Sequence, residues 1–199
     1  MKKKTAMVIF LCFVCVAVIG ICAMAGISKW QEYQTAQQRQ QQLDAYVDGL
    51  GSAFDDLYQV ETGLLDDMAQ QSTAGVSSRE ILLAAIEAVG RPMDQLASVQ
   101  APGELADAQR HFATAAESYH TMSDQLTTLL QDETQNPEQL RDTLINLLPD
   151  AIDAVDQVRY GIQVLAERDD ITLPDSAVQL EQSLDSLMNG GMDSLITQK

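Results

Sequence analysis

After residue 42, apolar residues recur along the chain in alternating steps of four and three. The first series consists of Leu43, Val47, Leu50, Phe54, Leu57, Leu64 and Met68. These steps place the side chains on one face of an α-helix, as in bundles and coiled coils. The spacing therefore predicts a long helix whose apolar face packs against other helices.

Glu61 interrupts this series between Leu57 and Leu64, where an apolar residue is expected. A carboxylate buried without a partner is energetically costly. Glu61 therefore either lies at the edge of the apolar face, with Val60 in the inward place, or meets a cation. The pattern alone leaves both alternatives open.

Four further helices are predicted from start signals that precede apolar series. Residues 77–80 (SSRE) form a capping box, in which side chains at both ends satisfy the first free N–H groups. Pro102 and residues 136–137 (NP) each place proline in a first turn, where its missing N–H is tolerated. Residues 172–175 (TLPD) mark the start of the last helix.

Two prolines fall inside predicted helices. Pro92 follows Gly90 and Arg91 and must kink or split the second helix, because proline removes a backbone hydrogen bond. We expect a kink, since the apolar series from Leu82 to Leu96 stays in phase across the proline. Pro149 is expected to bend the fourth helix.

The predicted fold is all-α. No segment alternates with the period of two that a half-buried strand requires. Short connections between the helices indicate an up-and-down antiparallel bundle of four to five helices. We assign this bundle to residues 43–199, after a glutamine-rich stalk at residues 28–42.

The chain begins with a basic tail, residues 1–5, and an uncharged apolar segment, residues 6–27. A helix of this length spans a bilayer, and lysines in the tail favour a cytoplasmic N-terminus. We therefore expect a single-pass signal-anchor helix with the bundle outside the cytoplasm. The alternative is a signal peptide cleaved after Ala25, which leaves a secreted protein. Lipidation at Cys22 is disfavoured, because Ile21 stands where a small residue is needed.

The charge and the positions of the cysteines exclude several kinds of partner and site. The 29 acidic residues outnumber the 12 basic ones and all follow the apolar segment. Such a surface repels nucleic acid and attracts cations. The three cysteines, Cys12, Cys15 and Cys22, all lie in the apolar segment. The bundle therefore has neither a disulfide nor a thiolate metal site.

Glu104, Asp107 and His111 are the candidate metal ligands, because steps of three and four stack them along one helix side. We favour a different interpretation. The acids occupy the first turn, where the helix dipole stabilises them, and Asp107 is expected to hydrogen-bond His111.

The sequence contains no glycine-rich phosphate loop, G-x-S-x-G elbow or His-Glu-x-x-His motif. We therefore expect no catalysis and no cofactor. The expected function is that of a membrane-anchored envelope scaffold or accessory subunit that acts through a protein partner. The alternative is an extracytoplasmic binding or sensor-like module for a small cationic ligand or a divalent metal.

Overall fold

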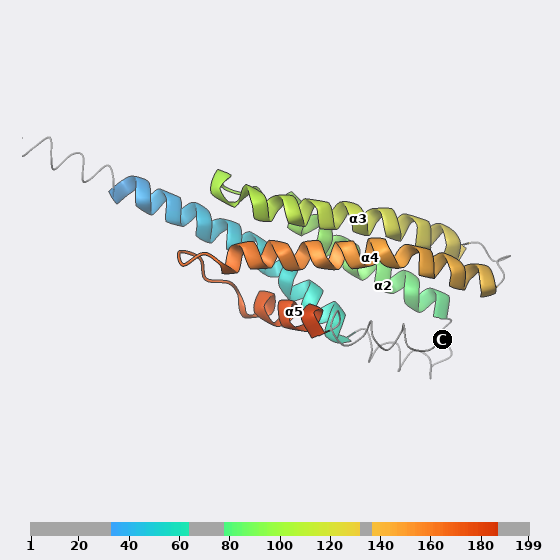
Figure 1. The fold of residues 1–199 in the computed structure, drawn as a ribbon. Helices are drawn as coiled ribbons and strands as arrows, with labels where there is room; N and C mark the ends of the chain where they lie inside the picture. The colour runs from blue at the N-terminus through green and yellow to red at the C-terminus, as the bar shows by residue number, and fades with distance from the viewer. Residues whose placement is uncertain (1–32, 64–77, 132–136, 187–199) are drawn as a thin grey trace, which may run out of the picture. The chain divides into compact units, whose positions relative to one another are not determined.

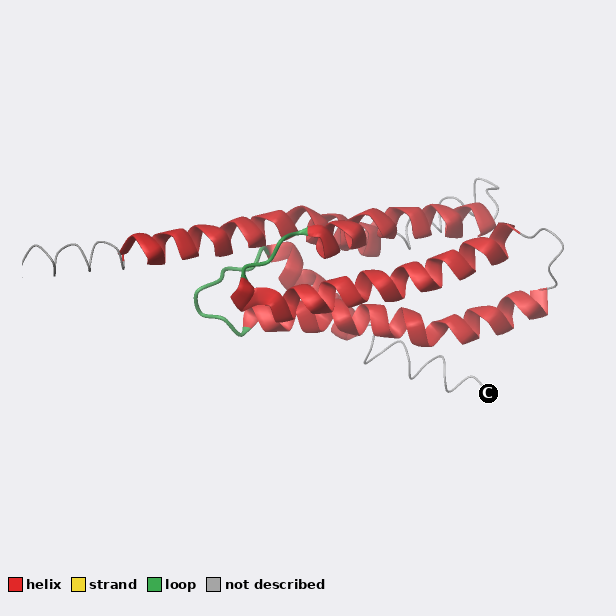
Figure 2. Cartoon of the chain, turned by 90° about the horizontal axis from the view of Figure 1, so that it is seen from above, coloured by secondary structure: helices red, strands yellow, loops and turns green. Residues whose placement is uncertain are grey.

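The computed structural model describes residues 33–63, 78–131 and 137–186. Residues 33–63 are helical, and five further elements follow: α2 (Ser78–Ser98), η1 (Gly103–Leu105), α3 (Ala106–Gln131), α4 (Pro137–Ala166) and α5 (Asp175–Ser186). These ranges contain no strand (Figure 2). The predicted all-α class is confirmed, and the described helices agree with a helical bundle.

The predicted membrane helix, residues 6–27, lies outside the described residues, as does the predicted cleavage position. None of the helices in the described ranges is both long and apolar enough to cross a membrane. Residues 33–42, the described part of the predicted stalk, are helical and exposed. The chain divides into two compact units between Gln42 and Leu43, the residue at which the apolar series begins.

The helices begin where the sequence signals place them. Pro137 is the first residue of α4, and Asp175 brings a negative charge to the first turn of α5. The start near Pro102 differs in detail. The Leu105 N–H donates to the Pro102 carbonyl at 2.8 Å in the 3₁₀ turn η1, and α3 begins only at Ala106.

Both internal prolines lie within continuous helices. α2 extends past Pro92 and α4 past Pro149. The split that Gly90-Arg91-Pro92 could have produced does not occur. Pro92 is buried, so packing against the neighbouring helices compensates for the backbone hydrogen bond that proline removes.

α3 and α4 pack side by side as antiparallel neighbours (Figure 1). The His111 Nδ1–H of α3 donates to Gln157 Oε1 of α4 at 2.7 Å. Further along α3, Ser118 Oγ donates to Asp153 Oδ2 at 2.7 Å. The residue numbers of the partners on α4 therefore decrease as the residue numbers on α3 increase. This is the antiparallel arrangement expected for short connections.

α2 and α3 are antiparallel by the same criterion. Gln109 Nε2 donates to the Leu96 carbonyl at 3.1 Å and to the Ala97 carbonyl at 2.7 Å. Ten residues later on α3, Tyr119 Oη donates to the carbonyl of Ile86, an earlier residue of α2. Side chains of α3 thus bind the backbone of α2 at two levels.

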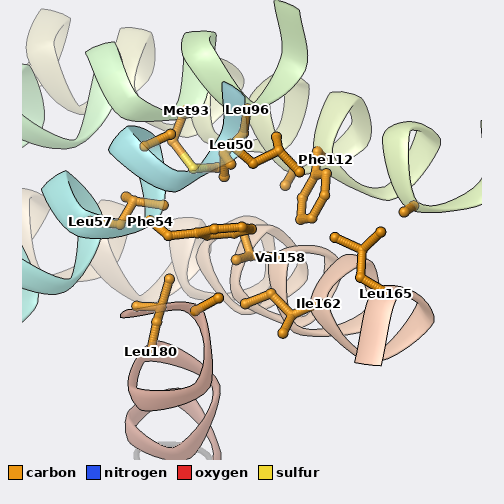
Figure 3. Packing of buried hydrophobic residues seen from close by; sticks show 14 of the residues in the cluster. Leu50, Phe54, Leu57, Met93, Leu96, Phe112, Val158, Ile162, Leu165 and Leu180 are labelled. Carbon is orange, nitrogen blue, oxygen red and sulfur yellow. The ribbon is translucent and has the colours of Figure 1, made fainter. Parts of the chain in front are cut away.

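The main core is centred on two aromatic rings. Phe54 and Phe112 meet edge to face, with ring centroids 5.8 Å apart and an angle of 67° between the planes, a favourable arrangement for aromatic pairs. Figure 3 shows the apolar side chains around them, which come from the same helices and from neighbouring ones. Those labelled there and buried in the same cluster include Leu50, Leu57, Met93, Leu96, Val158, Ile162, Leu165 and Leu180.

A second, smaller cluster continues the contact between α3 and α4 beyond the main core. It contains Leu126, Leu129 and Leu130 of α3 and Leu147 of α4, all at most 8% exposed. Ile86 of α2 packs against it. The bundle therefore has buried apolar residues at both levels.

Candidate functional site

An apolar cavity of about 280 Å³ lies within the bundle, between the helix of residues 43–63 and helices α2, α3, α4 and α5. Its wall includes one residue from each: Leu57, Met93, Met122, Val158 and Leu180. Four of these, all except Met122, are labelled in Figure 3. Cavities between the helices of bundles are common places for ligand sites.

Among the described residues that line this cavity, Glu61 is the only charged one. Ser183 Oγ of α5 donates a hydrogen bond to Glu61 Oε1. The other carboxylate oxygen, Oε2, is buried and has no hydrogen-bond partner within the described ranges. A buried acceptor without a donor costs about 1–3 kcal/mol. A positively charged donor next to Oε2 would therefore be stabilised.

This position bears on the alternatives that the sequence left open for Glu61. Val60 does line the cavity, yet Glu61 lines it as well. Within the described ranges, Glu61 has Ser183 as its partner and no basic side chain. The carboxylate is half-buried at the apolar wall, where a cation would complete its hydrogen bonding.

Tyr119 contributes an aromatic ring to the same cavity. Its hydroxyl donates to the Ile86 carbonyl. Burial, and to a lesser extent the charge of Asp94, raises the pKa of Tyr119 to about 12. The phenol therefore stays protonated near neutral pH and keeps its hydrogen bond to the backbone. An aromatic ring at a cavity wall attracts positive charge.

The metal-ligand candidates from the sequence are Glu104, Asp107 and His111, and each has a different partner. Arg168 Nη2 donates to Glu104 Oε2 at 3.0 Å, Arg110 donates to Asp107 Oδ1, and the His111 imidazole donates to Gln157. In the part of the chain that the structure describes, no group of three His, Cys, Asp or Glu side chains is arranged to hold a metal ion.

The hydrogen bond expected between Asp107 and His111 is not formed, and the expectation was wrong. Helix spacing correctly put the two residues on one side of α3. It could not show that α4 packs across this side and offers Gln157 to the imidazole, or that Arg110 lies nearer to Asp107.

Two members of the cavity site were missed by the sequence analysis. Ser183 is 122 positions from Glu61, and no local pattern connects them. Tyr119 contacts the backbone of α2 through its hydroxyl, and this contact depends on helix packing. The break in the apolar series at Glu61 was the only signal that pointed to this site.

Comparisons with protein-family models, with curated proteins and with solved structures find no match to this chain.

Proposed function

We propose that this protein is a non-catalytic binding module that holds a small cationic ligand in the cavity at Glu61. The observation that carries the proposal is the buried Oε2 of Glu61, which has no hydrogen-bond partner in the described ranges and belongs to a residue at the edge of an apolar cavity. An unpaired carboxylate in such surroundings is costly, and a bound cation removes the cost. The acidic composition favours cations near the protein.

Binding is favoured over catalysis by the chemistry of the lining. Besides Glu61, the ionisable residue among the described residues that line the cavity is Tyr119, which is protonated near neutral pH and bonded to a backbone carbonyl. General acid–base catalysis needs a group that exchanges its proton near the working pH and reaches the substrate. Tyr119 meets neither requirement, so the site is suited to hold a ligand.

The proposal also includes the membrane topology expected from the sequence. Residues 6–27 act as a single membrane span with the bundle outside the cytoplasm, supported by their length and the lysines before them. Mass spectrometry of the N-terminus of the mature protein tests this placement. A chain that retains the leader supports the anchor, and a chain that begins at Gly26 supports secretion after cleavage.

A protein-interaction role is the second candidate, favoured by a pair of exposed apolar residues on α4. Ile145 is 52% and Leu148 is 40% exposed, and a spacing of three puts them on one side of the helix. Cross-linking in intact membranes with the Ile145→Ser/Leu148→Ser variant tests this role. Lost cross-links support it, provided that Val178→Ser, a change at a similarly exposed residue of α5, keeps them.

Thermal unfolding of the full chain with a panel of cations tests the main proposal. The panel comprises divalent metals, polyamines and primary amines. We expect at least one cation to raise the Tm of the wild type and of Glu117→Gln, an exposed control on α3, but not that of Glu61→Gln. Equal responses in the three proteins would show surface charge effects and would contradict the proposal.

A further inference from the structure

We propose that residues 187–199 continue the helix of α5 and dock on an apolar face of α4. This α4 face consists of Ile145, Leu148 and Ile152, of which the first two are exposed and the third is half-buried. Docking there covers the surface on which the second candidate function places a protein partner, so that a partner has to displace the segment. The inference goes beyond cation binding at Glu61 and does not depend on it.

The α4 face lies on the side of α4 that α5 covers two turns further along. Its three residues follow each other in steps of three and four, and Arg159 comes seven residues after Ile152, so that all four share one side of the helix. At this level Arg159 Nε pairs with Asp185 Oδ1 of α5 at 3.2 Å. α5 therefore covers this side at Arg159, whereas Leu148 on the same side is 40% exposed.

The direction of α5 points its end toward the α4 face. Residues 167–174 connect the end of α4 to the start of α5, and the last turn of α5 has returned to the level of Arg159. α5 is therefore antiparallel to α4. It is described as far as Ser186, whereas α4 continues back to Pro137 (Figure 1). An extension of α5 in the same direction follows the α4 face.

The sequence after α5 carries apolar residues on the side that this contact requires. Met188, Met192 and Leu195 follow Asp185 in steps of three, four and three. In a continued helix these steps place them on the side of α5 that meets Arg159. The apolar side of the segment and the α4 face thus extend from the same ion pair.

Register and length agree with this placement. Both helices rise about 1.5 Å per residue, so equal numbers of residues from the ion pair stay level. Met192 then lies opposite Ile152, and Leu195 lies beside Leu148. At the same rise, residues 187–199 extend about 20 Å, which is enough to pass the whole α4 face.

The chain's own segment is favoured over a second copy of the protein. The segment is tethered to the bundle, and a short tether gives an effective concentration in the millimolar range. A second copy carries the same formal net charge of −17 and is repelled. Gly190 and Gly191 lower the helix propensity of the segment, so its helix depends on contact with α4.

Disulfide formation in the full chain in lipid nanodiscs tests the inference. The tested variant is Leu148→Cys/Leu195→Cys, in a background in which alanine replaces the natural cysteines Cys12, Cys15 and Cys22. Mild oxidation is followed by non-reducing electrophoresis and by mass spectrometry of the cross-linked peptides. We expect a disulfide within one chain, because the two positions lie side by side in the proposed register.

Asn146→Cys/Leu195→Cys in the same background is the matched control. Asn146 is exposed, and two residues before Leu148 it lies on the far side of α4. We expect the Leu148→Cys/Leu195→Cys disulfide to form at least tenfold faster than the control disulfide. In concentrated urea the two rates should be equal, since the closed loops have nearly the same length. Equal rates in the folded protein overturn the inference. Cross-links that form mainly between two chains also overturn it and assign the face to a second copy.

Maleimide labelling of Leu148→Cys provides a second measurement that needs no disulfide geometry. Leu195→Asp, added to this variant, brings a charge to the apolar contact, which is costly. We expect labelling to become at least fivefold faster. Thr197→Asp adds the same charge on the opposite side of the segment and should leave the labelling rate unchanged. Equal labelling rates with Leu195→Asp and Thr197→Asp overturn the inference.

Discussion

Tyr46 donates a hydrogen bond of 2.8 Å to Oε1 of Gln109, and the same side-chain amide binds the end of α2 through its Nε2. The last carbonyls of a helix have no intrahelical donor. Gln109 supplies a donor to two of them, Leu96 and Ala97, from a different helix. One amide therefore joins residues 43–63, α2 and α3 at one end of the bundle.

Replacing this amide should destabilise the bundle markedly. In Gln109→Leu the Tyr46 hydroxyl and two carbonyls lose their partner, and unsatisfied buried groups are costly. We expect the free energy of unfolding to fall by about 2 kcal/mol, measured by urea denaturation. Gln125→Leu, on an exposed part of α3, should change it by less than about 0.5 kcal/mol.

A double-mutant cycle checks that the loss belongs to this network. Tyr46→Phe alone should cost about 1 kcal/mol. If the two residues act together, adding Tyr46→Phe to Gln109→Leu should cost much less than it does in the wild type. Fully additive losses would contradict the proposed link.

Gly161 and Phe112 provide a second stability prediction, because the Phe112 ring occupies the space that a Cβ at residue 161 would need. Gly161→Ala should therefore lower the free energy of unfolding by about 1–3 kcal/mol, as overpacking does. The matched change Gly51→Ala should raise it by about 0.5–1 kcal/mol, since alanine is the better helix former and nothing lies within 4 Å of its Cβ.

A partial rescue identifies the cause of the Gly161 effect. Phe112→Leu removes ring atoms that meet the new Cβ, so the added cost of Gly161→Ala should be smaller in the Phe112→Leu background. If the cost of Gly161→Ala is the same in both backgrounds, contact with the ring does not explain it.

The predictable part of this fold is the part that depends on local spacing. Apolar steps of three and four placed Leu43, Leu50 and Phe54 on an inward face, and all three are fully buried. Pro137 marked the start of α4 because the fixed φ angle of proline suits the first helical position, where no backbone N–H is needed. Such signals act within one or two turns of the chain, so one sequence is enough to read them.

The candidate site depends on how helices pack, which local spacing does not determine. The break at Glu61 showed that something unusual occurs there, yet the cavity exists only because five helical segments leave a gap in front of it. Ser183 and Gln109 are ordinary polar residues by pattern. Their roles come from partners that lie far away in the sequence, Glu61 and the end of α2.

His111 allows a test of the metal interpretation. Glu104, Asp107 and His111 have separate partners in the structure, so Zn²⁺ should gain nothing specific from them. In His111→Ala we expect about 1 kcal/mol less stability, because the bond to Gln157 is lost, and the same Tm response to excess Zn²⁺ as in the wild type. A zinc-induced rise in Tm that disappears with His111 would instead support a metal site.

The stability of the bundle should fall at alkaline pH because of two buried tyrosines. Burial raises the pKa of Tyr46 above its usual value of 10.0, and burial with the charge of Asp94 raises the pKa of Tyr119 to about 12. Below pH ~10 both are protonated in the folded and unfolded chains, and their contribution is constant. From pH ~10 to ~12 the unfolded chain releases these protons first, so the equilibrium shifts toward unfolding.

Urea denaturation between pH 8 and 11.5 measures this loss. We expect the free energy of unfolding to decrease by about 1 kcal/mol per pH unit for each tyrosine above pH ~10. Tyr119→Phe should lower stability at pH 8, because the hydrogen bond to Ile86 is lost, and should also make the alkaline decline less steep. Tyr33→Phe, at a residue that is 67% exposed, should leave the decline unchanged. A decline equally steep in the Tyr46→Phe/Tyr119→Phe variant would show that other groups cause it.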